Sequence, residues 1–136
     1  MSLEHNKAVV VDFFDKIDRG DIDDAFAMMT DDATWWFPSD APGGITMAKA
    51  QMYAAVQAFS KVFKTSPKLE RGRITAEGDR VCLEQVSRGG ETHGGATYAN
   101  DYHLLITLRD GKVCEVREYM NPMLGAALMA EMQAAN

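Results

Sequence analysis

Residues 98–121 read YANDYHLLITLRDGKVCEVREYMN and contain two strand-like runs separated by Asp110 and Gly111. Apolar and polar residues alternate along both runs, which is typical of strands that bury one face. An Asp-Gly pair between such runs predicts an antiparallel hairpin. We therefore expect a long hairpin that contributes its apolar face to the core.

The length of the loop decides which residues of the hairpin face each other. A two-residue turn would place Leu104 opposite Arg117 and Ile106 opposite Glu115, and this would mix charge into both faces. A three-residue loop with Gly111 in the left-handed conformation avoids the mixing. It predicts four cross-strand pairs: Ile106 with Cys114, Leu104 with Val116, Tyr102 with Glu118, and Asn100 with Met120.

The longer loop places one carboxylate, that of Glu118, on the apolar face next to Tyr102. A slip of one residue would turn every side chain to the other face, so this arrangement is strongly specified. The outer, convex face collects the remaining residues: Asp101, His103, Leu105, Thr107, Val113, Glu115, Arg117 and Tyr119. An acid on an apolar face is a candidate functional residue, because burial perturbs its pKa.

The chain has 136 residues, a net charge of -6 and two cysteines, Cys82 and Cys114. This length fits one domain over residues 1–136. The acidic balance and the scattered Lys and Arg residues argue against a nucleic-acid partner. The cysteines lie in strand-like runs and are expected to be reduced. Because no segment has the ~20 apolar residues of a membrane span, or a signal-peptide core, a soluble cytoplasmic protein without membrane contact is expected.

Helical spacing of apolar residues dominates the first half of the chain, and strand-like alternation dominates the second half. Helices are expected at residues 4–18, at 21–29 with Asp21 as N-cap, at 46–63 with Thr46 as N-cap, and after Pro122. Strands are expected at residues 33–37, 68–76 and 80–88, before the hairpin. This order predicts an α+β fold in which a curved antiparallel sheet wraps around the N-terminal helices.

Several short motifs resemble known families. IDRGDIDDA at residues 17–25 and MTDDAT at 29–34 are similar to the opening of ketosteroid isomerases and SnoaL-like polyketide cyclases, and DGKV at 110–113 with REY at 117–119 resembles their closing hairpin. The resemblance implies the cone-shaped nuclear transport factor 2-like fold, also called cystatin-like. It further implies an apolar pocket on the concave face of the sheet and a homodimer through the convex face, where Leu105, Val113 and Tyr119 are apolar.

The catalytic positions of ketosteroid isomerases match apolar residues here. Where that family has a tyrosine, a general-base aspartate and a hairpin acid, this chain has Phe13, Phe37 and Leu104. Isomerisation would lose its acid-base and oxyanion contributions, each typically worth ~10²-fold or more. Ketosteroid isomerisation is therefore not expected.

Limonene epoxide hydrolases provide a second comparison, because they use an arginine and two aspartates on the sheet. The matching positions here are Gln85, Ser87 and Glu118, of which only Glu118 keeps a carboxylate. Hydrolysis of an epoxide by paired acids is therefore disfavoured.

Strand alternation and the isomerase match together predict the lining of the pocket. The apolar wall is Phe13, Trp35, Phe37, Leu104, Val116 and Met120, and the polar end is Gln85, Ser87, Asn100, Tyr102 and Glu118. An apolar cavity with a few convergent polar groups is the usual form of a small-molecule site. No element shows the spacing of metal ligands, so neither a metal nor a cofactor is expected.

Two functions remain open at this point. The first is a SnoaL-like enzyme of isomerase, cyclase, lyase or hydrolase type acting on a small apolar compound, with Glu118 as acid or base. Tyr102 and Asn100 would orient the substrate oxygen, and the apolar wall would hold its body. The second is a module that binds a hydrophobic ligand or dimerises without turnover, in which Glu118 belongs to a buried hydrogen-bond network.

Overall fold

The structure is a computed structural model that describes residues 2–134. The helices are α1 (Leu3–Asp18), α2 (Ile22–Ala27), α3 (Lys49–Val62), the 3₁₀ helix η1 (Pro122–Gly125) and α4 (Ala126–Ala134). The strands are β1 (Met29–Phe37), β2 (Ile45–Ala48), β3 (Phe63–Thr65), β4 (Lys68–Glu77), β5 (Arg80–Thr92), β6 (Thr97–Arg109) and β7 (Lys112–Tyr119). Helices therefore precede the long strands, as the sequence predicts.

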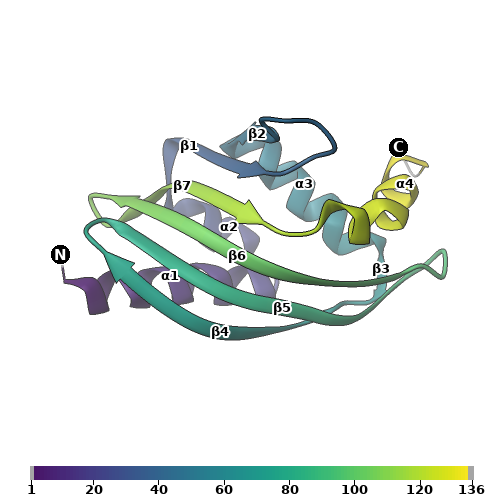
Figure 1. Ribbon diagram of the computed structural model, residues 1–136, viewed down its shortest axis with the longest axis horizontal. Helices are drawn as coiled ribbons and strands as arrows, with labels where there is room; N and C mark the ends of the chain where they lie inside the picture. The colour runs from purple at the N-terminus through teal and green to yellow at the C-terminus, as the bar shows by residue number, and fades with distance from the viewer. Residues whose placement is uncertain (1, 135–136) are drawn as a thin grey trace.

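All seven strands belong to one curved sheet, with α1, α2 and α3 on one side of it (Figure 1). The strand order is β2-β1-β7-β6-β5-β3, and β4 also pairs with β5. The α+β prediction is thus confirmed. The sheet is mixed rather than wholly antiparallel, because β1 runs parallel to β7. This parallel pair brings the first strand next to the last one.

The predicted register of the hairpin is wrong. Arg109 pairs with Lys112 across a two-residue turn, in which Asp110 and Gly111 both have positive φ, as a type I′ turn requires. An extra residue, Cys114, then forms a β-bulge that shifts the pairing by one. Neither of the two registers considered from the sequence includes this combination.

The bulge keeps the apolar residues on the core face and changes their partners. Ile106 pairs with Val116, and Leu104 pairs with Glu118. Glu118 thus shares a face with buried Val116, as predicted, but its cross-strand neighbour is not Tyr102. The bulge also turns Val113 into the core, where it is 0% exposed, so the assignment of Val113 to the convex face is wrong.

The third helix begins later than its sequence predicts. Residues 45–48 pair with β1 as the edge strand β2, and the helix starts at Lys49 with Ala48 as the N-cap residue. The Gln51 side chain accepts a hydrogen bond from the Ala48 N–H at 2.9 Å, which replaces the expected Thr46 cap. Asp21 does occupy the N-cap of α2, but its carboxylate binds Arg19 instead of capping the helix.

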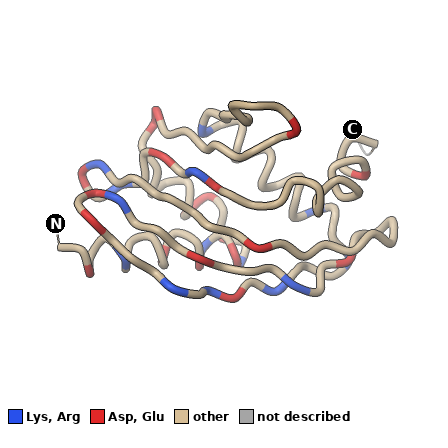
Figure 2. The backbone as a smooth tube through the Cα atoms, in the orientation of Figure 1, with Lys and Arg blue, Asp and Glu red and all other residues tan. Residues whose placement is uncertain are grey.

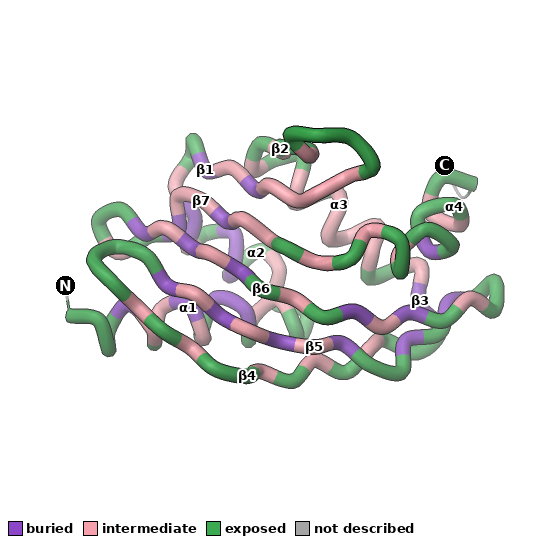
Figure 3. Tube along the Cα trace, in the orientation of Figure 1, coloured by how far each residue is buried: buried purple, intermediate pink, exposed green. Residues whose placement is uncertain are grey.

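The helices and the inner face of the sheet enclose one large hydrophobic core. Its buried members are Val10, Phe13, Phe14, Ala25, Phe26, Met29, Ala33, Trp35, Val81, Leu83, Leu104, Ile106, Leu108, Val113 and Val116. A second, small cluster consists of Phe63, Tyr98 and Leu128, which come from β3, β6 and α4. Buried and more exposed positions alternate along β5 and β6 in Figure 3, as period-two strands require.

Charged residues of both signs alternate on the outside of the fold. Figure 2 shows Lys and Arg interspersed with Asp and Glu along β4 and its neighbours. No helix within residues 2–134 combines the length and the apolar character needed to cross a membrane. Cys82 and Cys114 are both free thiols, as the sequence predicts.

Candidate functional site

Glu118 points into the space between the sheet and the helices, where it meets Trp35. β1 and β7 run parallel, and Trp35 pairs with Val116. Val116 lies two residues before Glu118, on the same face of β7. The Trp35 Nε1–H donates to Glu118 Oε1 at 3.2 Å. The indole itself is 3% exposed and packs against Phe13 and Phe14, with ring centroids 6.1 Å away from each. The acid is therefore held by a rigid aromatic donor.

Burial raises the pKa of Glu118 to about 7, and the hydrogen bond from Trp35 opposes this shift only in part. Within residues 2–134, Oε2 of Glu118 has no hydrogen-bond partner. One carboxyl oxygen is thus occupied by the protein and the other is free. A carboxyl group with a pKa near 7 can both donate and accept a proton at neutral pH.

Tyr102 occupies a different hydrogen-bond system from Glu118. It pairs with Gln85 on β5, and its hydroxyl lies 3.1 Å from Ser87 Oγ and 2.7 Å from the Tyr98 hydroxyl. Burial raises the pKa of both tyrosines, so both stay protonated at neutral pH. The charge of Glu118 contributes a smaller rise in each. Tyr102 is thus not the cross-strand partner of Glu118, because Glu118 pairs with Leu104, two residues further along β6.

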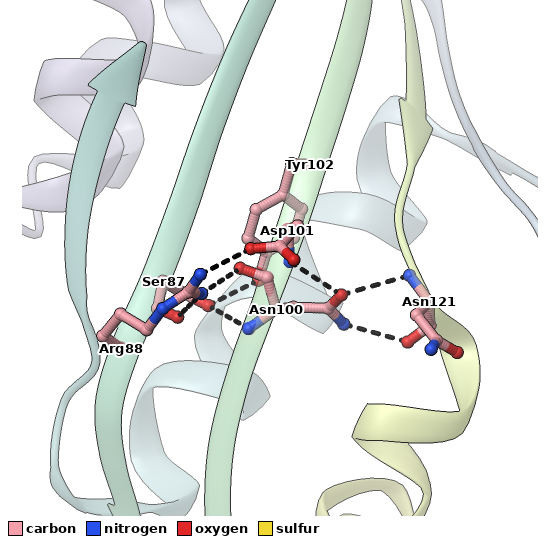
Figure 4. A network of polar contacts seen from close by, with 6 residues as sticks. All are labelled: Ser87, Arg88, Asn100, Asp101, Tyr102 and Asn121. Carbon is pink, nitrogen blue, oxygen red and sulfur yellow. Dashed lines mark hydrogen bonds and ion pairs between the residues drawn. The ribbon is translucent and has the colours of Figure 1, made fainter.

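Asn100 is buried and its amide is used by the protein. Its Nδ2 donates to Asn121 O at 2.9 Å and to the Tyr98 hydroxyl at 3.2 Å, and its Oδ1 accepts from the Asn121 N–H at 3.1 Å. Figure 4 shows Asn100 reaching from β6 across to Asn121, at the point where β7 has ended. Asn100 thus positions the chain after β7 and has no amide group free for a substrate.

Ser87 and Arg88 stabilise a second β-bulge, which bends β5 next to the site. The pairing of β5 with β6 shifts between Ser87 and Gly90, and Gly89 has a positive φ of 74°. Arg88 donates to the carbonyl oxygens of Ser87 and Asn100 and forms an ion pair with Asp101 on the outer face (Figure 4). The guanidinium therefore joins the backbones of β5 and β6 beside the bulge.

Gln85 is 8% exposed and is oriented by a charged residue that was not predicted from the sequence. The Arg71 Nη1 donates to Gln85 Oε1 at 2.9 Å, and the same guanidinium binds Asp15 and Asp18 of α1. This set of contacts ties α1 to β4 and β5. Gln85 and Arg71 are cross-strand partners, a pairing that depends on the register of β4.

A family model for the SnoaL-like domain matches residues 10–116. The chain belongs to the SnoaL-like family. In a comparison of sequences, no protein of curated function matches this SnoaL-like chain at a significant level.

Solved structures of similar fold cover nearly the whole SnoaL-like chain. A nuclear transport factor 2-like protein from Burkholderia xenovorans LB400 is 27% identical, with a TM-score of 0.74 over 93% of this chain and 97% of its own. PrhC from Penicillium brasilianum has a TM-score of 0.80 at 15% identity, over 97% and 90% of the two chains. An epoxide hydrolase of the LEH-like type from M. tuberculosis has a TM-score of 0.70 at 15% identity, over 98% and 96%. The predicted fold family is confirmed.

The predicted apolar wall of the SnoaL-like domain divides into two sets. The first set is at most 3% exposed and belongs to the closed core: Phe13, Trp35, Leu104 and Val116. Phe37 and Met120 are half-buried, and Phe37 packs against the edge of that core. The inner residues of α3 that pack on the two clusters are half-buried as well: Met52, Val56 and Phe59. The side chains most accessible to an apolar ligand therefore come from β1, α3 and the end of β7.

An open hollow of about 470 Å³ touches this region where β7 ends. It is lined by Tyr102, Met120 and Asn121 together with Glu84, Asp101, His103 and Tyr119 of the outer face. The strand pairing of β6 with β7 stops at His103 and Tyr119. Within residues 2–134, the residues of β6 that precede His103 therefore have no neighbouring strand on that side. A second hollow of about 360 Å³ lies beside α2, away from the predicted site residues.

Tyr98, like Arg71, is a residue that sequence reasoning missed at the site. It shares the inward parity of Asn100 and Tyr102, and this alternation could have identified it. Within residues 2–134, no three His, Cys, Asp or Glu side chains lie close enough together to hold a metal ion. The polar groups of the site are thus a carboxyl, an amide and hydroxyls.

Proposed function

We propose that this SnoaL-like protein is an enzyme that performs acid-base chemistry on a small apolar compound, with Glu118 as the group that transfers the proton. The observation that supports the proposal is the carboxyl of Glu118, whose pKa is about 7 and whose Oε2 has no partner within the described residues. Acids with such pKa values are enriched at functional sites. Trp35 holds the other oxygen in place.

The surroundings of Glu118 suit a proton transfer at a carbon or oxygen atom of an apolar substrate. In its protonated form Glu118 would donate to a developing oxyanion, and in its ionised form it would remove a proton. Isomerisation, cyclisation, dehydration and hydrolysis all use such a step. Phe37 and Met120 would contact the substrate body. Ketosteroid isomerisation stays excluded from the proposal, because that family's catalytic positions hold apolar side chains here.

A second candidate is a ligand-binding or dimerising module without turnover. It is favoured by the saturated hydrogen bonds of Ser87 and Asn100 and by an aromatic cluster on the convex face. Arg117 lies 4.1 Å from the Trp36 ring centroid, and Trp36 lies 4.9 Å from Tyr119, which is 42% exposed. Such a cluster suits a homodimer contact. A 15.0 kDa monomer in sedimentation at micromolar concentration would contradict the dimer.

The two candidates are separated by Glu118→Gln, which keeps an acceptor for Trp35 and removes the titrating group. The assay measures turnover and binding of a panel of small ketones, epoxides and lactones. An enzyme should lose ~10²-fold or more in kcat while it keeps its affinity for the compound. The matched control is Glu115→Gln, because Glu115 lies on the same strand as Glu118, pairs with Thr107 on β6 and lines neither hollow. An unchanged rate in Glu118→Gln would refute the catalytic role.

A further inference from the structure

Three hydroxyl groups form a continuous row on the inner face of β5 and β6. Ser87 Oγ lies 3.1 Å from the Tyr102 hydroxyl, which lies 2.7 Å from the Tyr98 hydroxyl. Each end of the row also accepts a hydrogen bond from Asn100: its backbone N–H donates to Ser87 Oγ at 3.1 Å, and its Nδ2 donates to Tyr98 at 3.2 Å. Asn100 itself is anchored by Asn121.

The row has one more O–H hydrogen than it has contacts between hydroxyl groups. Three hydroxyls carry three hydrogens, and the two contacts between them use one hydrogen each. Within residues 2–134 none of the three hydroxyls has a further acceptor. One O–H hydrogen is therefore left over, whichever way the individual bonds point.

Burial decides where the surplus hydrogen lies. Ser87 is 0% exposed and Tyr98 is 6% exposed, so a surplus hydrogen on either would be a buried donor without a partner. Tyr102 is half-buried, and it is the member of the row that lines the open hollow at the end of β7. If Ser87 and Tyr98 both donate to Tyr102, every buried group is satisfied and the Tyr102 hydrogen points outward from the row.

We propose that Tyr102 uses this surplus hydrogen to bind the oxygen of a carbonyl-bearing ligand, and that Ser87, Tyr98 and Asn100 are positioning residues that hold its hydroxyl. The inference rests on the proposed function, because it assumes that the ligand reaches the same interior as Glu118. It specifies the ligand further: an oxygen acceptor such as a ketone or an ester fits the O–H donor of a protonated tyrosine.

The test compares 1-indanone with indane, two probes of the same shape that differ by one carbonyl. The ratio of their dissociation constants is measured for the wild type and for Tyr102→Phe, because comparing ratios between proteins cancels the difference in hydrophobicity. We expect the ratio to move by about 3- to 10-fold toward indane in the variant, which is the size of one net hydrogen bond. An unchanged ratio would overturn the proposal, as would failure of both probes to bind the wild type.

Two further variants locate the effect. Tyr98→Phe should lower the preference for the ketone without abolishing it, because Ser87 still donates to Tyr102 but one of the two hydrogen bonds that hold its hydroxyl is lost. A preference equal to that of the wild type would contradict the positioning role of Tyr98. Tyr53→Phe is the matched control, since its hydroxyl binds Asp23 at 2.5 Å on the helical layer. A loss of preference in Tyr53→Phe would show that the effect is not local and would count against the proposal.

A measurement on the wild type covers the case in which Tyr102→Phe does not fold. The carbonyl stretch of bound, ¹³C-labelled 1-indanone should lie at a lower wavenumber than in hexane, because a donated hydrogen bond weakens the C=O bond. A band at the hexane position would overturn the proposal. Glu118→Gln keeps this shift if the hydroxyl row acts as proposed, so loss of turnover and loss of the ketone preference remain separate results.

Discussion

Two halves of the same strand pair, β5 and β6, bury different kinds of side chain. In the apolar half, cross-strand partners are both aliphatic: Val81 with Ile106, and Leu83 with Leu104. In the polar half, the partners are both polar: Gln85 with Tyr102, and Ser87 with Asn100. The change occurs at the same level in both strands. Each half is therefore internally consistent, and Glu118 of β7, which pairs with Leu104, lies at the boundary between them.

The two halves are stabilised in different ways. The apolar half gains from close packing against Phe13 and Trp35, which costs nothing in unsatisfied polar groups. The polar half keeps its groups buried only because nearly all of them are paired. Within residues 2–134, the buried side-chain atom without a hydrogen-bond partner is Arg71 Nε. The surplus hydrogen of the hydroxyl row is left at half-buried Tyr102. Under the proposed function, the first half would support the fold and the second half would contact the ligand.

The largest expected effect comes from breaking the apolar half. Phe13 is 0% exposed and contacts Phe14 and Trp35, so Phe13→Ala should lower the free energy of unfolding by about 3–5 kcal/mol. Phe59→Ala is the matched control, because Phe59 is half-buried and should cost less than half as much. Urea denaturation followed by circular dichroism measures both. Equal losses would show that the two parts of the interior are packed alike.

The next largest effect on stability is expected at Glu118, at the boundary between the apolar and polar halves, and it depends on pH. The pKa of Glu118 is raised from 4.5 to about 7 in the folded state, so the folded protein binds the proton more tightly than the unfolded chain. Its contribution to stability is therefore fully present below pH 4.5 and is lost as pH rises to 7. Between pH 5 and pH 8, the free energy of unfolding of the wild type should therefore fall by about 2–3 kcal/mol relative to that of Glu118→Gln. Parallel pH profiles of the two proteins would contradict this.

The smallest effect is expected in the polar half. Ser87→Ala leaves the Asn100 N–H without its acceptor, and it should cost about 1 kcal/mol. Leu83→Ala, on the same strand, should cost about 2–5 kcal/mol through the cavity it creates. Ser60→Ala on the exposed side of α3 is the control for the loss of a hydroxyl. If Ser87→Ala cost as much as Leu83→Ala, the polar half would be as important for folding as the apolar half.

Much of the fold follows from local patterns, whereas the errors arise where two strands meet. Thr46 reads as a helix cap, but β1 offers an edge with which Ile45 and Thr46 pair as β2. The inward positions of Gln85 and Ser87 were predicted from strand alternation, and that of Trp35 from alternation together with the isomerase resemblance, and each is buried. Arg71 was missed because its importance lies in Gln85, which it meets across the sheet, whereas the inward parity of Tyr98 on β6 could have been read from the sequence.

Glu118 illustrates which features follow from the sequence of one strand and which require the assembled sheet. Its inward face, shared with Val116, follows from the sequence because side chains along a strand alternate with a period of two. Its neighbours do not follow, because the bulge at Cys114 sets the register. That bulge depends on β7 pairing with two strands at once, and the Val113 N–H donates to Met28 O at 2.9 Å just before the start of β1. Alternation is a property of one strand, whereas register belongs to the assembled sheet.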